Sequence, residues 1–248
     1  GQNFSKPFDI KFIDEDEKEK YAYQTTYGPA YSRIYASVLA IHGDNKGIVL
    51  PYDLAATQVV IIPVIFKGKE KKVLDHCRKL LKTLREKGVR AELDDSEKTP
   101  GYKYNYWELL GASLRLEIGT REVDNKEYTI VRRDTGKKEL VKDLDKYLST
   151  IGKKMLKDMR DKADKWFEGN VRKAKDMKEL ESALKKGGFV RIEFCSRDMD
   201  GLECADKIGE EFQAEVRGTL HGKKETPKGK CVVCGKKAKE VVYVAKAY

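Results

Sequence analysis

Four of the five cysteines lie close together in the sequence, in a pattern that suits metal binding. Cys231 and Cys234 belong to the segment Cys-Val-Val-Cys-Gly, in which the glycine allows backbone N–H groups to turn toward two thiolates. Cys195 and Cys204 are separated by eight residues and fall at the predicted end of a strand and start of a helix. Four thiolates on two short loops form a tetrahedral set of soft ligands, so we expect one structural zinc ion per chain. The alternative is two unrelated buried thiols and a redox-active Cys-x-x-Cys.

The remaining cysteine and the histidines do not extend this site. Cys77 lies on the apolar face of a predicted helix, where packing in the core is the expected role. The three histidines, His42, His76 and His221, have no ligand spacing to one another. His42 could reach a phosphate, but a neutral imidazole at the end of a helix is the alternative.

A segment between residues 100 and 121 interleaves aromatic rings with charged side chains. Its members are Tyr102, Tyr104, Tyr106, Trp107, Lys103, Glu108, Arg115 and Arg121. Unstacked bases are bound by rings that stack on them and by charges that meet phosphates and base edges. A carboxylate such as Glu108 can accept both donors of a guanine Watson–Crick edge, while an arginine or lysine donates to the guanine carbonyl oxygen. The alternative is that half of these aromatics, Trp107 and one tyrosine among them, belong to the core.

Arg33 opens a predicted helix over residues 32–42, after the Gly28-Pro29 turn. A helix N-terminus already favours anions through its free N–H groups, and a guanidinium there makes a phosphate site plausible. The alternative is a surface arginine on a helix that is buried through Ile34, Val38 and Ile41.

The bulk composition favours a polyanionic partner. With 51 Lys and Arg against 41 Asp and Glu, the net charge is +10, and 40% apolar residues are enough for ordinary cores. The chain of 248 residues is too long for one typical domain and predicts two or three units. The longest apolar run is too short to span a bilayer and no signal peptide is recognisable, so we expect a soluble, cytoplasmic protein without a membrane partner.

The order of predicted elements indicates an α/β fold. Strands are predicted over residues 58–65, 89–93, 114–118 and 127–133, with a helix over 69–87 and a short helix from Tyr102 onward. One long helix, or two, is predicted over 139–170. Beyond it we expect helices over 176–186 and 205–212 and strands over 189–194, 214–220 and 240–245. Two strands over 8–13 and 20–26 would be marginally stable alone, which predicts that the chain is a piece of a longer one.

Segments spread over the whole chain resemble the archaeal and eukaryotic type of prolyl-tRNA synthetase. Together with the helix opened by Arg33, they are GQNFSK, YAYQTTYG, HGDNKGIVLP, TQVVIIPV, PGYKYNYWELLGASLRLEIG, VRRDTGKK and CVVC. The resemblance implies that residues 1–50 end a class II catalytic domain with its antiparallel sheet. Residues 51–150 would form a mixed-sheet anticodon-binding domain, and 151–248 a small α+β domain associated with zinc.

The resemblance also implies roles for single residues. Arg33 resembles the motif 3 arginine that holds the ATP γ-phosphate, Gln24 and Thr26 resemble positions lining the adenylate and proline pocket, and the carboxylate of Tyr248 would reach toward the active site. Among the candidate tRNA-binding residues Tyr104, Glu108, Arg115 and Arg121, the family's anticodon contacts cluster where Glu108 and Arg115 fall. This suits proline anticodons, which carry two guanines.

The sequence departs from the family pattern at three places. Tyr27 stands where a tryptophan is usual, the segment from Gly28 to Arg33 is one residue longer, and the spacing between Cys195 and Cys204 is wide. The second departure bears on the lining of the substrate pocket, and the third on the geometry of the zinc site.

The implied activity is that of a proline–tRNA ligase, which joins proline to ATP, with magnesium, and transfers the prolyl group to tRNA. Its partners would be the tRNA for proline, ATP, proline and, in a homodimer, a second subunit. Because motifs 1 and 2 are not in the sequence, we expect this chain alone to bind tRNA but to activate proline poorly. The alternatives are a free-standing, non-catalytic tRNA-binding module and a zinc-ribbon interaction protein without an RNA role.

Overall fold

A mixed five-stranded sheet forms the centre of the first folded unit. The computed structural model describes residues 1–65 and 70–246. Strands β3 (Val59–Pro63), β4 (Ala91–Leu93) and β5 (Leu114–Ile118) run parallel, whereas β6 (Tyr128–Arg132) and β7 (Lys138–Val141) extend the sheet in antiparallel fashion. The strand order is β4-β3-β5-β6-β7. This arrangement confirms the predicted mixed α/β fold class.

Both faces of this sheet are covered, because alternate residues of β3 point to opposite sides. Val59 and Ile61 pack against α2 (Glu70–Glu86) and the start of α5 (Leu144–Gly169). Val60 and Ile62 pack against Trp107 and Tyr104 of α3 (Pro100–Leu109). All five residues of β3 are buried, as expected for a continuous apolar run in a central strand.

A second unit is built on a four-stranded sheet of order β10-β11-β9-β8. Its strands are β8 (Val171–Lys173), β9 (Phe189–Phe194), β10 (Ala214–Gly218) and β11 (Glu240–Lys246). Helices α6 (Met177–Lys185) and α7 (Leu202–Phe212), the latter preceded by a 3-10 turn over Met199–Gly201, pack on this sheet around Val190, Ile192 and Ile208.

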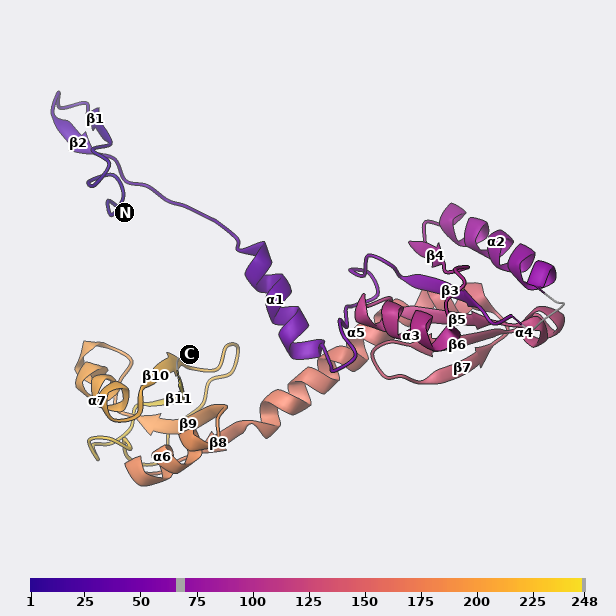
Figure 1. Cartoon of the computed structure of the whole chain (residues 1–248). Coiled ribbons are helices and arrows are strands. Elements are labelled where there is room, and N and C mark those ends of the chain that lie inside the picture. Colours follow the sequence, from indigo (N-terminus) through magenta and orange to yellow (C-terminus); the bar gives the residue numbers. More distant parts are fainter. Residues whose placement is uncertain (66–69, 247–248) are drawn as a thin grey trace.

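Helix α5 joins the two units (Figure 1). A buried cation anchors it in the first unit. Arg132, at the end of β6, donates to Asp134 and to Asp158 of α5, with Nη2 lying 2.7 Å from Asp158 Oδ2. This hydrogen bond holds the pKa of Asp158 below its usual range. With about 1.5 Å of rise per residue, the 26-residue helix is about 39 Å long.

The first 42 residues extend away from both sheets (Figure 1). Strands β1 (Lys11–Ile13) and β2 (Glu19–Tyr21) form a two-stranded sheet of their own among the described residues, and α1 (Tyr31–His42) follows. No residue of α1 is buried, so the interpretation of a helix buried through Ile34, Val38 and Ile41 is wrong for this structure. Ile34 and Ile41 are exposed and Val38 is half-buried. Helix α1 contacts α5, and at the end of α1 the pKa of His42 is lowered by burial and by Lys162.

Several predicted boundaries and elements need correction. The strands expected over 8–13 and 20–26 are shorter, because each has one partner strand within the described residues. The helix expected from residue 139 begins instead at Leu144, where Asp143 accepts a hydrogen bond from the Lys146 N–H as its N-cap. Residues 138–141 form β7 because they complete the open edge of β6. Helix α4 (Thr120–Asn125) and β8 were not predicted at all. The first residue of the predicted helix over 69–87, Lys69, lies outside the described residues.

Within residues 1–65 and 70–246, no helix is long and apolar enough to cross a membrane.

The contrast between the buried sheet and the exposed first helix gives a stability prediction. Ile61 is fully buried and Ile34 is 59% exposed. Replacing Ile61 by alanine should lower the free energy of unfolding by about 2–5 kcal/mol through lost burial and a cavity. The matched Ile34→Ala variant should stay within about 0.5 kcal/mol of the parent. Urea unfolding in a Trp166→Phe background, in which Trp107 is the remaining tryptophan, measures both by fluorescence, and equal losses would contradict this packing.

Candidate nucleic-acid interface and metal centre

A row of alternating charges crosses the sheet face beneath α3. Arg115 of β5 donates from Nη1 to Glu108 Oε1 at 2.9 Å and from Nε to Glu117 Oε1 at 3.1 Å. The two carboxylates each meet a second cation, Lys138 Nζ at 2.6 Å from Glu117 Oε2 and Lys46 Nζ at 3.5 Å from Glu108 Oε2. The charges therefore alternate from Lys46 to Lys138, and we refer to these five residues as the charge row.

The strand register places the middle of the charge row. Arg115 and Glu117 are two residues apart on β5 and so share one face of the sheet. They lie beside Val60 and Ile62 of β3, the residues whose side chains pack under α3. The Arg115 side chain is 12% exposed and that of Glu108 18%. Charges that are this far from water are tolerated when they are paired and hydrogen-bonded.

Tyr104 adds an aromatic ring to the charge row. The Arg115 guanidinium carbon lies 4.0 Å from the Tyr104 ring centroid, which is a cation–π contact. Tyr104 therefore serves both the core under α3 and the charged site, whereas Tyr102 and Tyr106 are exposed and stack on each other. The indole of Trp107 donates to Asp94 at 2.8 Å and packs on Val60 and Ile62, which supports the core interpretation for this residue.

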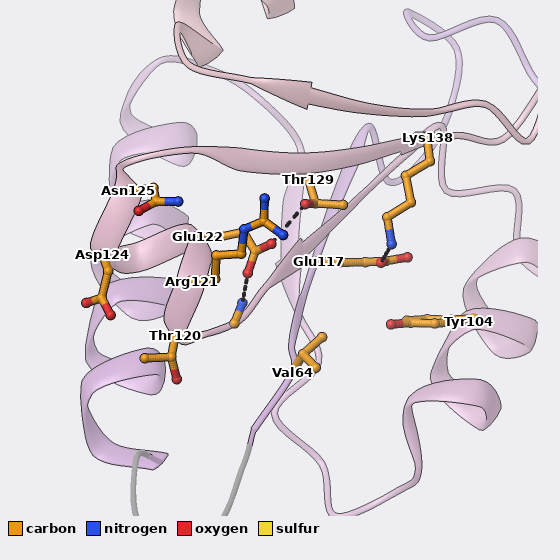
Figure 2. A pocket seen from close by; sticks show the side chains of 11 residues that line it. Val64, Tyr104, Glu117, Thr120, Arg121, Glu122, Asp124, Asn125, Thr129 and Lys138 are labelled. Atoms are coloured by element: carbon orange, nitrogen blue, oxygen red, sulfur yellow. Dashed lines mark hydrogen bonds and ion pairs between the residues drawn. The ribbon is translucent and has the colours of Figure 1, made fainter.

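A cavity of about 850 Å³ opens beside the Lys138 end of the charge row (Figure 2). Tyr104, Glu117 and Lys138 line one side, and Arg121 of α4 lies on the other. Helix α4 is held there because Glu122 accepts from the Gly119 N–H and from the Thr129 hydroxyl. The structure thus brings Tyr104, Glu108 and Arg115 into one network, while the exposed Arg121 belongs to the cavity without joining their ion pairs.

The turn of residues 44–47 carries Lys46, which is the other end of the charge row. Arg133, directly after β6, donates to both oxygens of Asp44 at 2.9 and 2.6 Å and from Nε to the Glu108 carbonyl at 2.9 Å. The guanidinium holds the pKa of Asp44 well below its usual range. Sequence reasoning missed Lys46, Glu117, Lys138, Asp44 and Arg133. Asp44 and Arg133 are 89 residues apart, and no local pattern indicates such a pair. Glu117 is two residues from Arg115, a spacing that places both side chains on one face of a strand and could have revealed it.

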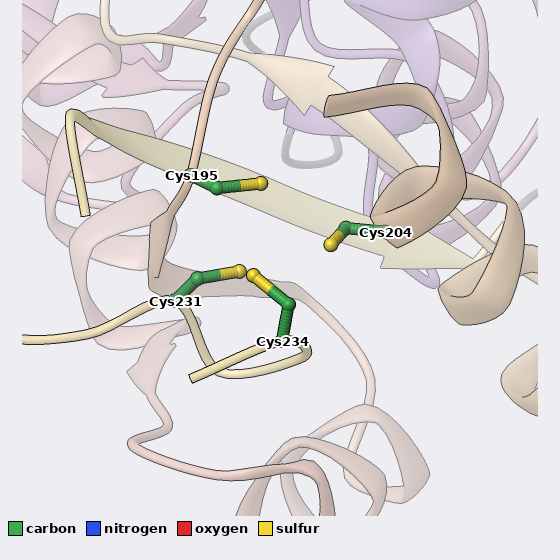
Figure 3. A group of neighbouring side chains, drawn as sticks. All are labelled: Cys195, Cys204, Cys231 and Cys234. Atoms are coloured by element: carbon green, nitrogen blue, oxygen red, sulfur yellow. The ribbon is translucent and has the colours of Figure 1, made fainter. Parts of the chain in front are cut away.

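The four cysteines predicted as ligands come together in the second unit (Figure 3). Cys195 follows β9, Cys204 lies in the first turn of α7, and Cys231 and Cys234 lie on the loop before β11. Their Sγ atoms all lie within 4.8 Å of one another. Such a set of four convergent sulfurs could hold a metal ion.

The backbone shapes this cluster. Gly235, at a φ of +71°, donates its N–H to the Cys231 carbonyl, and the Cys231 N–H donates to the Lys236 carbonyl. Burial raises the pKa of Cys195 and Cys204, whereas the Lys236 N–H lowers the pKa of Cys234. The fifth cysteine, Cys77, is isolated in the core of the first unit, where burial raises its pKa to about 12.

Comparisons with known proteins agree with this division into two units. Residues 58–155 match the family described as the anticodon binding domain, and residues 177–248 match the one described as the C-terminal region of prolyl-tRNA synthetase. A proline–tRNA ligase of Thermofilum pendens is 44% identical over 253 residues, which cover 100% of this chain and 52% of that protein. The chain belongs to the prolyl-tRNA synthetase family. The resemblance inferred from the sequence is thereby confirmed.

Further members of the prolyl-tRNA synthetase family show how far the similarity extends. The proline–tRNA ligase of Pyrococcus abyssi is 35% identical over 100% of this chain. Solved structures of prolyl-tRNA synthetases from Cryptosporidium parvum and Giardia lamblia match with TM-scores of 0.78 and 0.81, at 31% and 30% identity. Both matches cover 100% of this chain and 53% of the solved chain. The chain spans about half the length of the curated relatives it matches.

The N-terminal candidates from the family resemblance lie in α1 and in the segment between β2 and α1, which extends away from the five-stranded sheet (Figure 1). Arg33 is exposed in the first turn of α1, and its guanidinium makes no ion pair with any residue in 1–65 or 70–246. Gln24 is partly buried and its Oε1 has no hydrogen-bond partner among the described residues, while Thr26 is exposed. No hydrogen bond joins Arg33 to either of them in that part of the chain. Tyr248 lies outside the described residues.

The sulfur cluster gives a metal-binding prediction. A single Co²⁺ should bind with thiolate charge-transfer absorption, and the Cys204→Ala variant should lose part of it because one of the four Co–S bonds is gone. Binding should weaken as the pH falls, since protons compete with the metal for the thiols and burial favours the protonated forms of Cys195 and Cys204.

The Cys77→Ala variant is the matched control, because Cys77 lies outside the cluster. Its absorption should equal that of the parent. Unchanged thiolate absorption in Cys204→Ala would remove this residue from the ligand set.

Proposed function

We propose that this chain is the C-terminal part of a proline–tRNA ligase and that its five-stranded unit reads the anticodon of proline tRNA. In this proposal, residues 1–50 belong to a catalytic domain, 51–150 form the anticodon-binding domain and 151–248 form the C-terminal domain. The whole enzyme would join proline to ATP and transfer the prolyl group to tRNA in the cytoplasm. Similarity to proline–tRNA ligases over the full chain supports this proposal against a free-standing tRNA-binding module.

The observation that carries the proposal is the pairing of Glu108 with Arg115 beside Tyr104. Guanine offers two donors, N1–H and the N2 amino group, next to one acceptor, O6. Glu108 supplies carboxylate oxygens for the donors, while Arg115 and Lys138 supply N–H groups for the acceptor. Tyr104 and the Arg115 plane offer surfaces on which an unstacked base can lie.

Because the charges alternate, the lysine at each end of the charge row can exchange its carboxylate partner for a phosphate of a bound RNA. Lys46 is 65% exposed and Lys138 61%, so both ends of the charge row can leave their carboxylates for phosphates at small cost. The central Arg115 is held by two carboxylates and stays in position. A preorganised centre with adaptable ends is a favourable arrangement for base recognition.

The N-terminal residues would serve the ATP site of the complete enzyme. Arg33 is exposed and free of ion pairs within the described residues, which supports its proposed role as the cation for the ATP γ-phosphate, with magnesium on the nucleotide. The unpartnered Oε1 of Gln24 supports a ligand contact by this residue, and Thr26 would line the same pocket. We include Tyr248 and a homodimeric assembly in the proposal on the family resemblance alone.

The C-terminal domain would hold one zinc ion through Cys195, Cys204, Cys231 and Cys234. Zinc favours four thiolates in tetrahedral arrangement, and sulfurs this close together are compatible with that geometry despite the wide spacing of the first pair. Within this chain the ion would fix the loop before β11 to the end of β9 and to α7.

Removing the Glu108 carboxylate tests anticodon reading. We expect Glu108→Ala to weaken binding of a proline anticodon stem-loop about tenfold or more, because a bidentate base contact contributes about 1–3 kcal/mol. The variant should fold, since Arg115 keeps Glu117 as its partner. Fluorescence anisotropy with a labelled stem-loop gives the affinity.

The matched control for this experiment is Glu86→Ala, which changes an exposed glutamate at the end of α2. Its affinity should equal that of the parent chain. Equal binding of Glu108→Ala and the parent would refute the reading role.

Elemental analysis tests the zinc proposal separately. The chain purified without chelator should contain about one zinc per molecule, as expected for a closed four-thiolate structural site. The Glu108→Ala variant should contain as much zinc as the parent, because the cysteines belong to the other unit. A preparation with no zinc, or with a different metal in equal amount, would overturn this part of the proposal.

A further inference from the structure

The backbone of Glu108 is held by a residue that sequence reasoning did not single out. Arg133 is buried, and its Nε donates to the Glu108 carbonyl at 2.9 Å. This carbonyl belongs to the last turn of α3, where helix carbonyls lack intrahelical partners. The Gly111 N–H donates to the same oxygen at 3.2 Å, so both of its lone pairs are used. Arg133 therefore fixes the residue from which the candidate guanine-reading carboxylate extends.

Asp44 in turn fixes Arg133. The two remaining nitrogens of the guanidinium donate to the two Asp44 oxygens in a bidentate pair, at 2.9 and 2.6 Å. Bidentate pairs constrain orientation as well as distance, because the planar fork matches the carboxylate. Asp44 is itself held in a turn, in which its Oδ1 accepts from the Lys46 N–H at 2.9 Å and its N–H donates to the Gly47 carbonyl.

The turn that carries Asp44 sits directly on the end of α3. The Ile48 N–H donates to the Leu109 carbonyl at 3.2 Å. A Cβ on Gly47 would lie 2.5 Å from the Leu109 Cα, and Gly47 has a φ of +131°, so this close approach requires glycine. The turn also delivers Lys46 to Glu108 Oε2. The contacts of the 44–47 turn thus reach both the backbone and the side chain of Glu108.

We propose that the Asp44–Arg133 pair is a specificity determinant of the anticodon site, because it positions Glu108 for the guanine edge without touching the base. The proposal rests on the function proposed above. A bidentate contact to N1–H and N2–H₂ needs both carboxylate oxygens within hydrogen-bond distance at once, and a displacement of about 0.5–1 Å loses one of them. Arg115 fixes only Oε1, so the helix end must be held as well, and Arg133 is the side chain that holds the Glu108 backbone, beside the backbone contacts of Gly111 and Ile48.

The same geometry separates the roles of the two neighbouring cations. Lys46 is exposed and its single contact with Glu108 is 3.5 Å long, so it can release Oε2 to a base. The Arg133 side chain is 4% exposed and makes three hydrogen bonds to fixed partners, so it stays in place when RNA binds. Lys46 is the group that yields to the ligand, and Arg133 and Asp44 are positioning residues.

The test compares guanine with inosine, which lacks the 2-amino group. Two stem-loops of proline anticodon sequence, one with guanines and one with inosines in their place, are titrated against the parent chain, Asp44→Asn and Arg133→Lys. The parent should prefer the guanine loop about tenfold or more. In Asp44→Asn the preference should fall to about twofold or less, with the affinity for the inosine loop nearly unchanged. Arg133→Lys, which keeps the charge but loses the fork, should give an intermediate preference.

Two variants control this experiment. Asp145→Asn removes an exposed carboxylate that pairs with Lys87 in the same unit, and it should keep the full guanine preference. Asp44→Glu keeps the carboxylate and should recover part of the preference that Asp44→Asn loses. Equal weakening of both loops in Asp44→Asn, or an unchanged preference, would overturn the positioning role.

Failure of this inference can be distinguished from failure of the proposed function. If Glu108→Ala keeps the guanine preference, anticodon reading by Glu108 is wrong. If Glu108→Ala loses the preference while Asp44→Asn and Arg133→Lys keep it, only the positioning role is wrong. Circular dichroism of each variant establishes that the compared chains are folded.

Discussion

The candidate reading site depends on a positive charge that is largely withdrawn from water. Moving an ion out of water costs several kcal/mol after relaxation, so a guanidinium in the position of Arg115 requires partners on every side. Glu108 and Glu117 supply carboxylates and Tyr104 supplies the face of a ring. Each carboxylate then needs compensation itself, which Lys46 and Lys138 provide at the surface. The charge row is the consequence of burying one cation beneath a helix.

This constraint links the fold to the chemistry. Residues of β5 alternate between the two faces of the sheet, so Arg115 and Glu117 can point toward α3 while Leu114 and Leu116 pack on the other face. The end of α3 places Glu108 within hydrogen-bond distance of Arg115. Arg133 directly follows β6 and Lys138 begins β7, so these antiparallel strands position both cations. The site therefore draws on these four elements and on the 44–47 turn, which supplies Lys46, and neither the helix nor the strand alone would form it.

Local patterns were sufficient for much of this structure. The apolar run of β3 indicated a strand buried on both faces, and the spacing of Val73, Cys77, Leu80 and Leu84 indicated α2, because both signals lie within one element. The pair Cys231 and Cys234 indicated a loop whose thiolates converge, and the cysteines do gather. Tyr104, Glu108 and Arg115 could be grouped as one candidate site because they lie within a dozen residues of each other. In the structure they meet across one helix-to-strand connection.

Other features depend on partners that no local pattern reveals. Residues 138–141 carry a pattern compatible with a helix, and only the free edge of β6 makes them a strand. Asp44 and Arg133 are 89 residues apart, so their pair became visible only when the chain was folded. The periodicity of α1 correctly indicated a helix, but a pattern cannot tell whether a complementary surface is present, and none of its residues is buried among the described parts of the chain.

Helix α5 sets both the distance between the two units and the rotation of one unit relative to the other about the helix axis. It is continuous over 26 residues, with its start packed in the first core and its end leading directly into β8 of the second unit. Adding one residue to a straight α-helix lengthens it by about 1.5 Å and also rotates everything beyond it by about 100°. Length changes in this rod therefore reorient the sulfur cluster relative to the sheet of the first unit, unless they come in steps of about seven residues, which restore the original direction after two turns.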